Sequence, residues 1–363
     1  MVIDMWIHFV IVLLIFLFSY VGYKYIPNNK ILCISIFVPL FALAAFRSIN
    51  VGNDTKEYFR IFQIISNQSS ITSALTVSRY EPGYIIYNYL LSRFTDNFQW
   101  VLAINAGIYL TAVLYFLNKY LTDIRMGLML FFSFGLYYNV MNLERQCIAT
   151  AIFLFAFPFL EDKKYIKYII LILFAATFHS TALILMAIPL IPEIDFSKKN
   201  ELFKWTIISV IFLVLLNYGI TFIISYFPYM SHYMTDSMYS VGGVRSASVA
   251  ICLLRLLSVG LIILVFGKIY QEEDSARTNL FNKMILLDCV ISIASIGFNM
   301  YDRIEKYICI GFIVAITNNL KIMSNNNRRI VYGIIFILSF SYLTISLIYR
   351  PGWSGIFPYA LYK

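Results

Sequence analysis

Long apolar runs constrain the fold of this chain more than any other feature. Ile, Leu, Phe and Tyr accumulate in stretches of close to 20 residues, the length that a helix needs to cross about 30 Å of hydrocarbon. The 363 residues are 60% hydrophobic and only 13% charged, whereas soluble domains carry about a quarter charged residues. We therefore predict an all-α polytopic membrane protein.

The apolar pattern predicts about ten spanning helices and one integral membrane domain over residues 1–363. The helices are expected near 6–22, 31–46, 98–117, 126–141, 146–160, 205–226, 249–267, 283–300, 305–320 and 331–348. The first run does not resemble a cleavable signal peptide, because "MVIDMW" carries an Asp and no Lys or Arg. The segment 47–97 contains amphipathic stretches that predict short helices lying at the membrane interface.

The stretch 168–192 reads either as one long helix or as two short arms that meet at His179. Loop charge distinguishes the two, because cytoplasmic loops collect Lys and Arg. A single crossing would place Lys198, Lys199 and Lys204 outside, whereas a broken hairpin keeps them inside. We therefore predict a re-entrant hairpin whose turn is covered by protein or lines a water-filled cavity. In this topology both chain termini lie on the outer side.

This topology separates the two basic residue types, since most Lys are cytoplasmic and most Arg are not. The outer face and the membrane hold Arg47, Arg60, Arg79, Arg93, Arg145, Arg245, Arg255, Arg303 and Arg350. Arg binds phosphate bidentately and is less strongly hydrated than Lys, so this distribution indicates an anion site. The alternative is that these Arg pair with neighbouring acids. The candidate partners are Asp54, Glu57, Glu81, Glu144, Asp302 and Glu305.

The stretch "RSINVGNDTKEYFR" places several charges directly after an apolar run. "VGNDT" is a turn signal, and Asp54 followed by Glu57 predicts a helix start with a capping box. In a functional interpretation, Asp54 orients or deprotonates a hydroxyl while Arg47 and Arg60 reach a phosphate. The two interpretations are compatible.

Three further motifs carry candidate site residues. In "RYEPGY", Glu81 precedes a turn pair and either closes the loop with Arg79 or does chemistry. In "NLERQCIATAIFLF", Glu144 and Arg145 open an apolar helix and point about 100° apart, so they face different partners. His179 lies where the backbone must be irregular at membrane depth, which favours a function.

A later motif, "YDRIEKYICIGF", predicts a helix capped by Asp302 with Glu305 at its third position. The helix dipole does not stabilise Arg303 in the first turn, so a bound anion would explain it. Outer aromatic residues such as Tyr58 and Tyr84 offer surfaces for sugar rings. The net charge of +9 is explained by topology, and nothing indicates nucleic acid binding. The His and Cys residues form no convergent set, so we predict no metal site.

Taken in order, these motifs resemble the EpsG family of Wzy-like polysaccharide polymerases. The residues that carry the resemblance are "RSINVGNDTKEY", "EPGY", "ERQCIATAI", "ATFHSTALI" and "DRIEKY", over roughly residues 40–310. Asn53 departs from the pattern, since we expect a small or hydroxyl residue there. The resemblance implies a bundle of helices in the bacterial plasma membrane, loosely like membrane glycosyltransferases that use lipid-phosphate donors.

The resemblance also implies a reaction, in which oligosaccharide repeat units carried on undecaprenyl diphosphate are joined at the outer membrane face without metal or cofactor. Donor and acceptor are both lipid-linked, and a chain-length regulator and a flippase are the expected protein partners. The diphosphate is expected to bind Arg47, Arg145, Arg303 and Arg60. The base is left open among Glu81, Asp54 and His179, with Glu81 or Asp54 preferred and His179 as the orienting residue. The sugar or acceptor contacts are assigned to Tyr58, Tyr84 and Glu144.

Two other functions compete with polymerisation. A ligase that moves finished glycan onto another acceptor would use the same donor and similar Arg residues. A transporter or flippase for the lipid-linked sugar should instead show charged or broken segments near the midplane and paired repeats. The sequence does not identify the sugars, the stereochemical outcome or the product polysaccharide.

Overall fold

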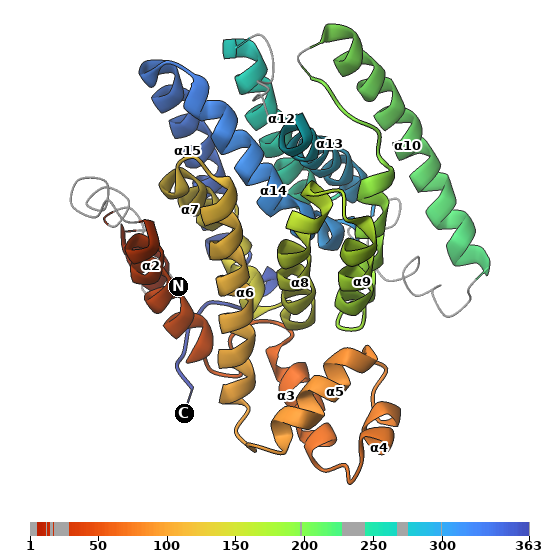
Figure 1. Cartoon of the computed structure of the whole chain (residues 1–363). Helices are drawn as coiled ribbons and strands as arrows, with labels where there is room; N and C mark the ends of the chain where they lie inside the picture. The colour runs from red at the N-terminus through yellow and green to blue at the C-terminus, as the bar shows by residue number, and fades with distance from the viewer. Residues whose placement is uncertain are drawn as a thin grey trace. The chain divides into compact units, whose positions relative to one another are not determined.

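The computed structural model describes residues 6–11, 13–14, 17, 29–196, 198–226, 244–266, 275–298 and 300–362. These residues are mostly helical (Figure 1), which confirms the predicted all-α class. The helices of the first half are α2 (Asn29–Ala45), α3 (Thr55–Ser66), α4 (Ile71–Thr76), α5 (Pro82–Ser92), α6 (Gln99–Tyr120), α7 (Ile124–Ser133), α8 (Glu144–Glu161) and α9 (Tyr165–Ala176). The later helices are α10 (Lys199–Tyr226), α12 (Ser246–Phe266), α13 (Ser275–Gly297), α14 (Tyr301–Ile322) and α15 (Asn325–Tyr349). Three 3₁₀ segments complete the set: η2 (Leu136–Met141), η3 (Ser180–Leu190) and η5 (Pro351–Trp353).

By length and composition, four helices of the described residues are suited to cross a membrane: α6, α12, α13 and α15. Shorter apolar helices accompany them, including α9 and α7. A membrane-embedded chain is therefore confirmed, whereas the count of ten spans stays a prediction. The predicted helix at 6–22 lies partly outside the described residues.

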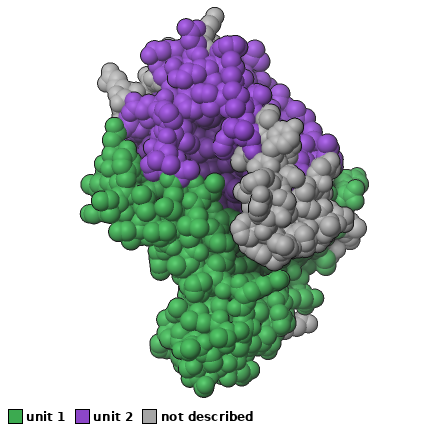
Figure 2. All heavy atoms as spheres, turned by 90° about the vertical axis from the view of Figure 1, so that its right-hand side faces the viewer, with its two compact units in different colours: residues 1–186, 339–363 green, residues 187–338 purple. Residues whose placement is uncertain are grey.

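Two compact units divide the chain (Figure 2). The first comprises residues 1–186 and 339–363, and the second comprises residues 187–338. Compact units need not be separate domains, so the single membrane domain remains a prediction.

In the first unit, α3, α4 and α5 form a small group at one end of α6 and α8 (Figure 1). Helix α3 buries Tyr58, Ile61, Phe62 and Ile65, the spacing of a helix with one apolar face. Ile61 and Ile65 pack with Ala74 of α4 and Ile85 of α5. The predicted short helices in 47–97 are thus present, and their place at a membrane interface stays a prediction.

The break predicted at His179 is present. Helix α9 ends at Ala176, and a 3₁₀ segment runs from Ser180 to Leu190. The Tyr168 hydroxyl donates to the Leu185 carbonyl at 2.8 Å, although a straight helix would separate these residues by about 25 Å. The chain therefore folds back on itself near His179, as a hairpin requires.

Several local predictions are wrong. Asp54 precedes α3 but already has helical backbone angles, and its side chain makes no capping hydrogen bond. Glu57 pairs with Arg60 instead, so there is no capping box at this helix. Asp302 is the second residue of α14, whose cap position is Met300. The expected continuous helix at 126–141 is broken at Gly135, which has a left-handed φ of 76°.

The C-terminal segment 350–362 is tied to the loop that follows α2. The Ser48 amide donates to the Ala360 carbonyl at 2.8 Å, and the Tyr362 amide donates to the Phe46 carbonyl at 2.9 Å. The Asn53 side chain donates to two carbonyls of the same segment, at 3.0 and 2.9 Å. This role explains why an amide occupies a position where a smaller residue was expected.

In the second unit, α13 packs closely against α14 and also contacts α10 and α12. Gly311 permits the approach of α14, because a Cβ there would lie 2.6 Å from the Met284 Cγ. Lys283 lies within α13 and is largely buried.

Candidate functional site

Three motifs that are far apart in the sequence meet at one carboxylate, Glu81, just before α5. Its Oε2 accepts a hydrogen bond from Arg145 Nη1, at the start of α8. Its Oε1 accepts from the Ser180 backbone N–H at 3.0 Å and from the Ser180 hydroxyl at 3.1 Å. The His179 Nδ1 lies 3.5 Å from the same oxygen. The site thus combines an arginine, a carboxylate, a histidine and the first turn of η3.

The "EPGY" turn packs against the chain where α9 ends, at Thr177. The Gly83 amide donates to the Thr177 carbonyl at 2.8 Å. A Cβ on Gly83 would lie 2.2 Å from the Thr177 Oγ1, so a side chain at this position would push the two segments apart. Pro82 occupies the first position of α5, where its missing N–H costs no helical hydrogen bond. These features place Glu81 against Ser180.

Two tyrosine rings lie close to the guanidinium of Arg145. The Tyr80 ring lies 3.9 Å from the Arg145 Cζ, a cation–π contact. Tyr58 is buried beside Tyr80, with ring centroids 6.1 Å apart. The Arg145 and Glu81 side chains each remain 16% exposed, so the pair is open to solvent on one side.

The electrostatic balance keeps Glu81 ionised. Burial alone would raise the pKa of Glu81. The hydrogen bond from His179, the charge of Arg145 and the Ser180 N–H together outweigh burial and hold its pKa well below the ordinary value. A carboxylate stabilised in this way is a weak base.

A second arginine–glutamate pair, Arg47 and Glu144, is closed to solvent. Arg47 Nη2 contacts Glu144 Oε1 at 3.0 Å, and both side chains are fully buried. Asn105 donates to the other Glu144 oxygen at 2.9 Å, and the Tyr87 hydroxyl donates to Asn105 at 2.7 Å. As predicted, the consecutive residues Glu144 and Arg145 face different partners. The expected diphosphate contact of Arg47 and acceptor contact of Glu144 do not fit this buried arrangement.

The other residues predicted for the site differ in how close they lie to Arg145 and in how exposed they are. Burial raises the pKa of both Tyr58 and Tyr80, Arg145 lowers it and Asp54 raises it further, so both charges lie near these rings. Arg60 is exposed and pairs with Glu57 at 2.6 Å. Tyr84 is fully buried, so its ring is not available for stacking on a sugar.

Arg303 lies on α14 in the second unit, and a common role with Arg145 stays a prediction.

Sequence reasoning missed two members of the site, Tyr80 and Ser180. Both stand inside motifs that were singled out, directly beside Glu81 and His179. Ser180 had an available signal, because a hydroxyl and a free N–H at the first turn of a helical segment favour anions. Asp288 was also missed, although a lone acid in an apolar run is a functional candidate by default.

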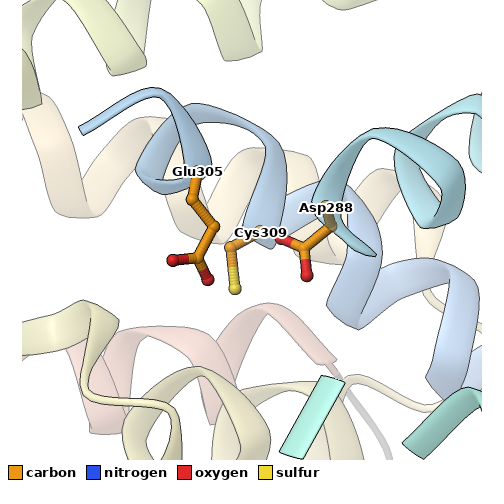
Figure 3. A group of neighbouring side chains, drawn as sticks. All are labelled: Asp288, Glu305 and Cys309. Carbon is orange, nitrogen blue, oxygen red and sulfur yellow. The ribbon is translucent and has the colours of Figure 1, made fainter. Parts of the chain in front are cut away.

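Among the described residues, one group has the ligand types for a metal ion: Asp288, Glu305 and Cys309, all buried in the second unit. Their ligand atoms lie within 4.8 Å of one another (Figure 3). Arg255 contacts both carboxylates, so a positive charge already stands beside them.

The fold and the site together define a membrane-embedded helical protein with a partly open Arg–Glu–His cluster. The sequence model of the EpsG family matches residues 30–361, nearly the whole chain, and the protein belongs to that family. EpsG is a Wzy-like polymerase family, associated with polysaccharide polymerisation in exopolysaccharide biosynthesis. No curated protein and no solved structure matches the chain.

Proposed function

We propose that this protein joins oligosaccharide repeat units carried on undecaprenyl diphosphate, at the outer face of the bacterial plasma membrane. The observation that carries the proposal is the convergence of Arg145, the Ser180 N–H and hydroxyl, and His179 on the Glu81 carboxylate. A phosphate oxygen requires the same donors, with Arg as the preferred cation. In this proposal the donor diphosphate binds Arg145 on its open side.

The reaction is a displacement at the anomeric carbon of the donor glycan. The hydroxyl oxygen of the acceptor sugar forms a bond to this carbon, and the bond from the carbon to the diphosphate oxygen breaks. The lipid diphosphate leaves with the bonding electron pair, and Arg145 stabilises the charge that develops on it. Stabilising a developing charge with fixed donors is usually the largest catalytic contribution.

The proton of the acceptor hydroxyl goes to His179 in this mechanism. Glu81 is the weaker base, because Arg145 and Ser180 stabilise its ionised form. Its carboxylate lies beside Nδ1 and is placed to orient the imidazole and to stabilise the imidazolium that forms. We assign Asp54 and Tyr80 to the acceptor, because Tyr80 contacts Arg145 and is partly exposed, and the charge of Asp54 acts on Tyr80. In this arrangement His179 is the base and Glu81 orients it.

The test is a deletion strain complemented with wild type, Arg145→Lys, His179→Ala or Glu81→Gln, with surface glycan analysed as a ladder on a gel. Arg79→Lys is the matched control, since Arg79 is exposed and lies in the same motif as Glu81. Membrane levels of every variant are measured by immunoblot.

We expect the deletion to leave single-repeat glycans. Arg145→Lys and His179→Ala should fail to restore long chains, whereas Arg79→Lys should restore them. Loss of even single repeats from the surface of the deletion strain would contradict polymerisation, because the protein would then act earlier or move the substrate.

A further inference from the structure

An exposed tryptophan lies in the segment that follows α15. Trp353 is the last residue of η5 and is 49% exposed. Its backbone N–H donates to the Arg350 carbonyl at 2.9 Å. The Asn53 side chain donates to the carbonyls of Gly352 and Trp353, at 3.0 and 2.9 Å. Hydrogen bonds thus fix the backbone that carries this exposed ring.

The same segment is tied to the loop that leads toward the Arg145 site. The Gly52 N–H donates to the Gly355 carbonyl at 2.8 Å. The Asn53 N–H donates to the side-chain oxygen of Asn142, also at 2.8 Å. Asn142 stands three residues before Arg145, so their Cα atoms are at most about 11 Å apart. A chain of hydrogen bonds therefore holds Trp353 near the residue that we propose binds the donor diphosphate.

The polar groups around Trp353 are suited to sugar hydroxyls. Arg350 is exposed, and its Cζ lies 5.7 Å from the Trp353 ring centroid. Asn142 is partly exposed, and its NH₂ group has no hydrogen-bond partner among the described residues. A sugar presents polarised C–H groups on its ring face and hydroxyls at its edge, and the face of a tryptophan ring is negative. An aromatic surface with a few polar groups is the usual composition of a small-molecule site.

A membrane anchor is the alternative role for an exposed tryptophan next to a spanning helix, because Trp is enriched at membrane interfaces. An anchor needs an exposed ring but no fixed distance from a second site. Trp353 differs in this respect, because the chain leaves α15 after Tyr349 and its next residues bond to the loop before α3. Trp100, 58% exposed at the second position of α6, has the simpler setting of an anchor.

We propose that Trp353, with Arg350 beside it, is a subsite for the glycan part of the lipid-linked substrate and binds a sugar remote from the reacting carbon. This inference rests on the proposed function and adds the glycan to the diphosphate as a recognised group. No bond is made or broken at the subsite. Because an additional contact slows the release of a long glycan, the subsite favours repeated additions to the same chain.

The first test measures glycan binding without lipid and without catalysis. The probe is the soluble repeat-unit oligosaccharide that mild acid releases from the lipid-linked pool of the host strain. Its Kd for the purified full-length protein in detergent is measured by isothermal titration calorimetry. We expect Trp353→Leu to weaken binding about fivefold, the effect of losing one aromatic contact. Trp353→Phe keeps a ring face and should remain within about twofold of wild type.

The matched control is Trp100→Leu, which removes another exposed indole at the start of a spanning helix. It should bind the oligosaccharide as wild type does. In the deletion strain, Trp353→Leu should shift the glycan ladder to shorter chains while still joining repeat units. Trp353→Phe and Trp100→Leu should restore the wild-type distribution. Immunoblots of membranes correct each ladder for the amount of protein.

Three results would overturn the subsite. One is wild-type protein that does not bind the oligosaccharide at millimolar concentration, and another is Trp353→Leu binding it as wild type does. The third is an equal loss of membrane protein in Trp353→Leu and Trp100→Leu with unchanged binding, which would identify Trp353 as an anchor. Failure of the proposed function has a separate sign, the absence of single repeats from the surface of the deletion strain, and the binding assay does not depend on it.

Discussion

Glu144 and Arg145 are consecutive residues of α8, and each forms an ion pair with a residue from another segment. The Arg47–Glu144 pair is closed, with both side chains at most 1% exposed and further hydrogen bonds on the glutamate. The Arg145–Glu81 pair is 16% exposed on each side and lies beside His179 and an aromatic ring. The same two residue types therefore form a buried packing contact on one side of α8 and, on the other side, a partly exposed pair that we propose as the anion site.

The largest expected effect comes from breaking the closed pair. Arg47→Met leaves Glu144 charged and buried without its partner, which should cost about 3 to 5 kcal/mol of stability. Thermal unfolding in detergent and the amount of protein in membranes measure the loss. The double variant Arg47→Met with Glu144→Leu should recover much of it, because no buried charge then remains. A double variant as unstable as the single one would contradict a structural role for the pair.

Changing the open pair should affect activity while leaving the fold intact. Arg145→Lys keeps the charge but loses the fork that binds two phosphate oxygens. We expect polymerisation to fall by about 100-fold or more, the usual cost of removing one donor to a developing charge. Initial rates with purified lipid-linked substrate measure this fall, and the melting temperature should stay within a few degrees of wild type. Retention of activity within threefold would remove Arg145 from the site.

The stability that the open Arg145–Glu81 pair contributes should also depend on pH. The pKa of Glu81 is held below its ordinary value, so its contribution to stability is present above about pH 4.5, the pKa of an unfolded glutamate. That contribution is lost as the pH falls from there toward the lower folded pKa. Glu81→Gln should lose about 1.5 kcal/mol at neutral pH, and its deficit against wild type should shrink between pH 5 and 3. A deficit that is constant with pH would show that the ionised carboxylate is not the stabilising form.

The smallest effect should come from the ring beside the open pair. Tyr80→Leu removes the cation–π contact with Arg145, worth about 0.5 to 1 kcal/mol at a partly exposed site. We expect KM for the donor to rise about three-fold with little change in kcat. Tyr80→Phe keeps the ring face and is the matched control. An equal effect of both variants would assign the contribution to the hydroxyl.

Much of the architecture was predictable because it follows from local patterns. Apolar run lengths predicted the helices, and the distribution of Lys predicted the break at His179. The ordered motifs predicted the family. Local patterns could not predict which acid pairs with which arginine. Arg145 and Glu81 are 64 residues apart in the sequence, and only the folded chain brings them together. Arg47 and Arg145 look equivalent in the sequence, and only burial distinguishes them.

The missing cap at Asp54 has a different origin. The sequence "DTKE" matches a capping pattern, but Asp54 adopts helical backbone angles that turn its side chain away from the next amides. The loop around it is fixed by distant partners, including the Met141 carbonyl, which lies 1.9 Å from where a Cβ of Gly52 would be. Tertiary contacts of this kind override a local signal.

The ties between the C-terminal segment and the loop after α2 have a consequence for biosynthesis. The first unit is discontinuous, since residues 339–363 complete a structure begun by residues 1–186. While the ribosome is still making the second unit, the Phe46–Asn53 loop lacks the carbonyls and amides with which it pairs in the finished protein. The helices can enter the membrane in order, but the loop leading to α3 closes only after residues 350–362 have been synthesised. A chain that stops before this segment leaves the loop without its hydrogen-bond partners.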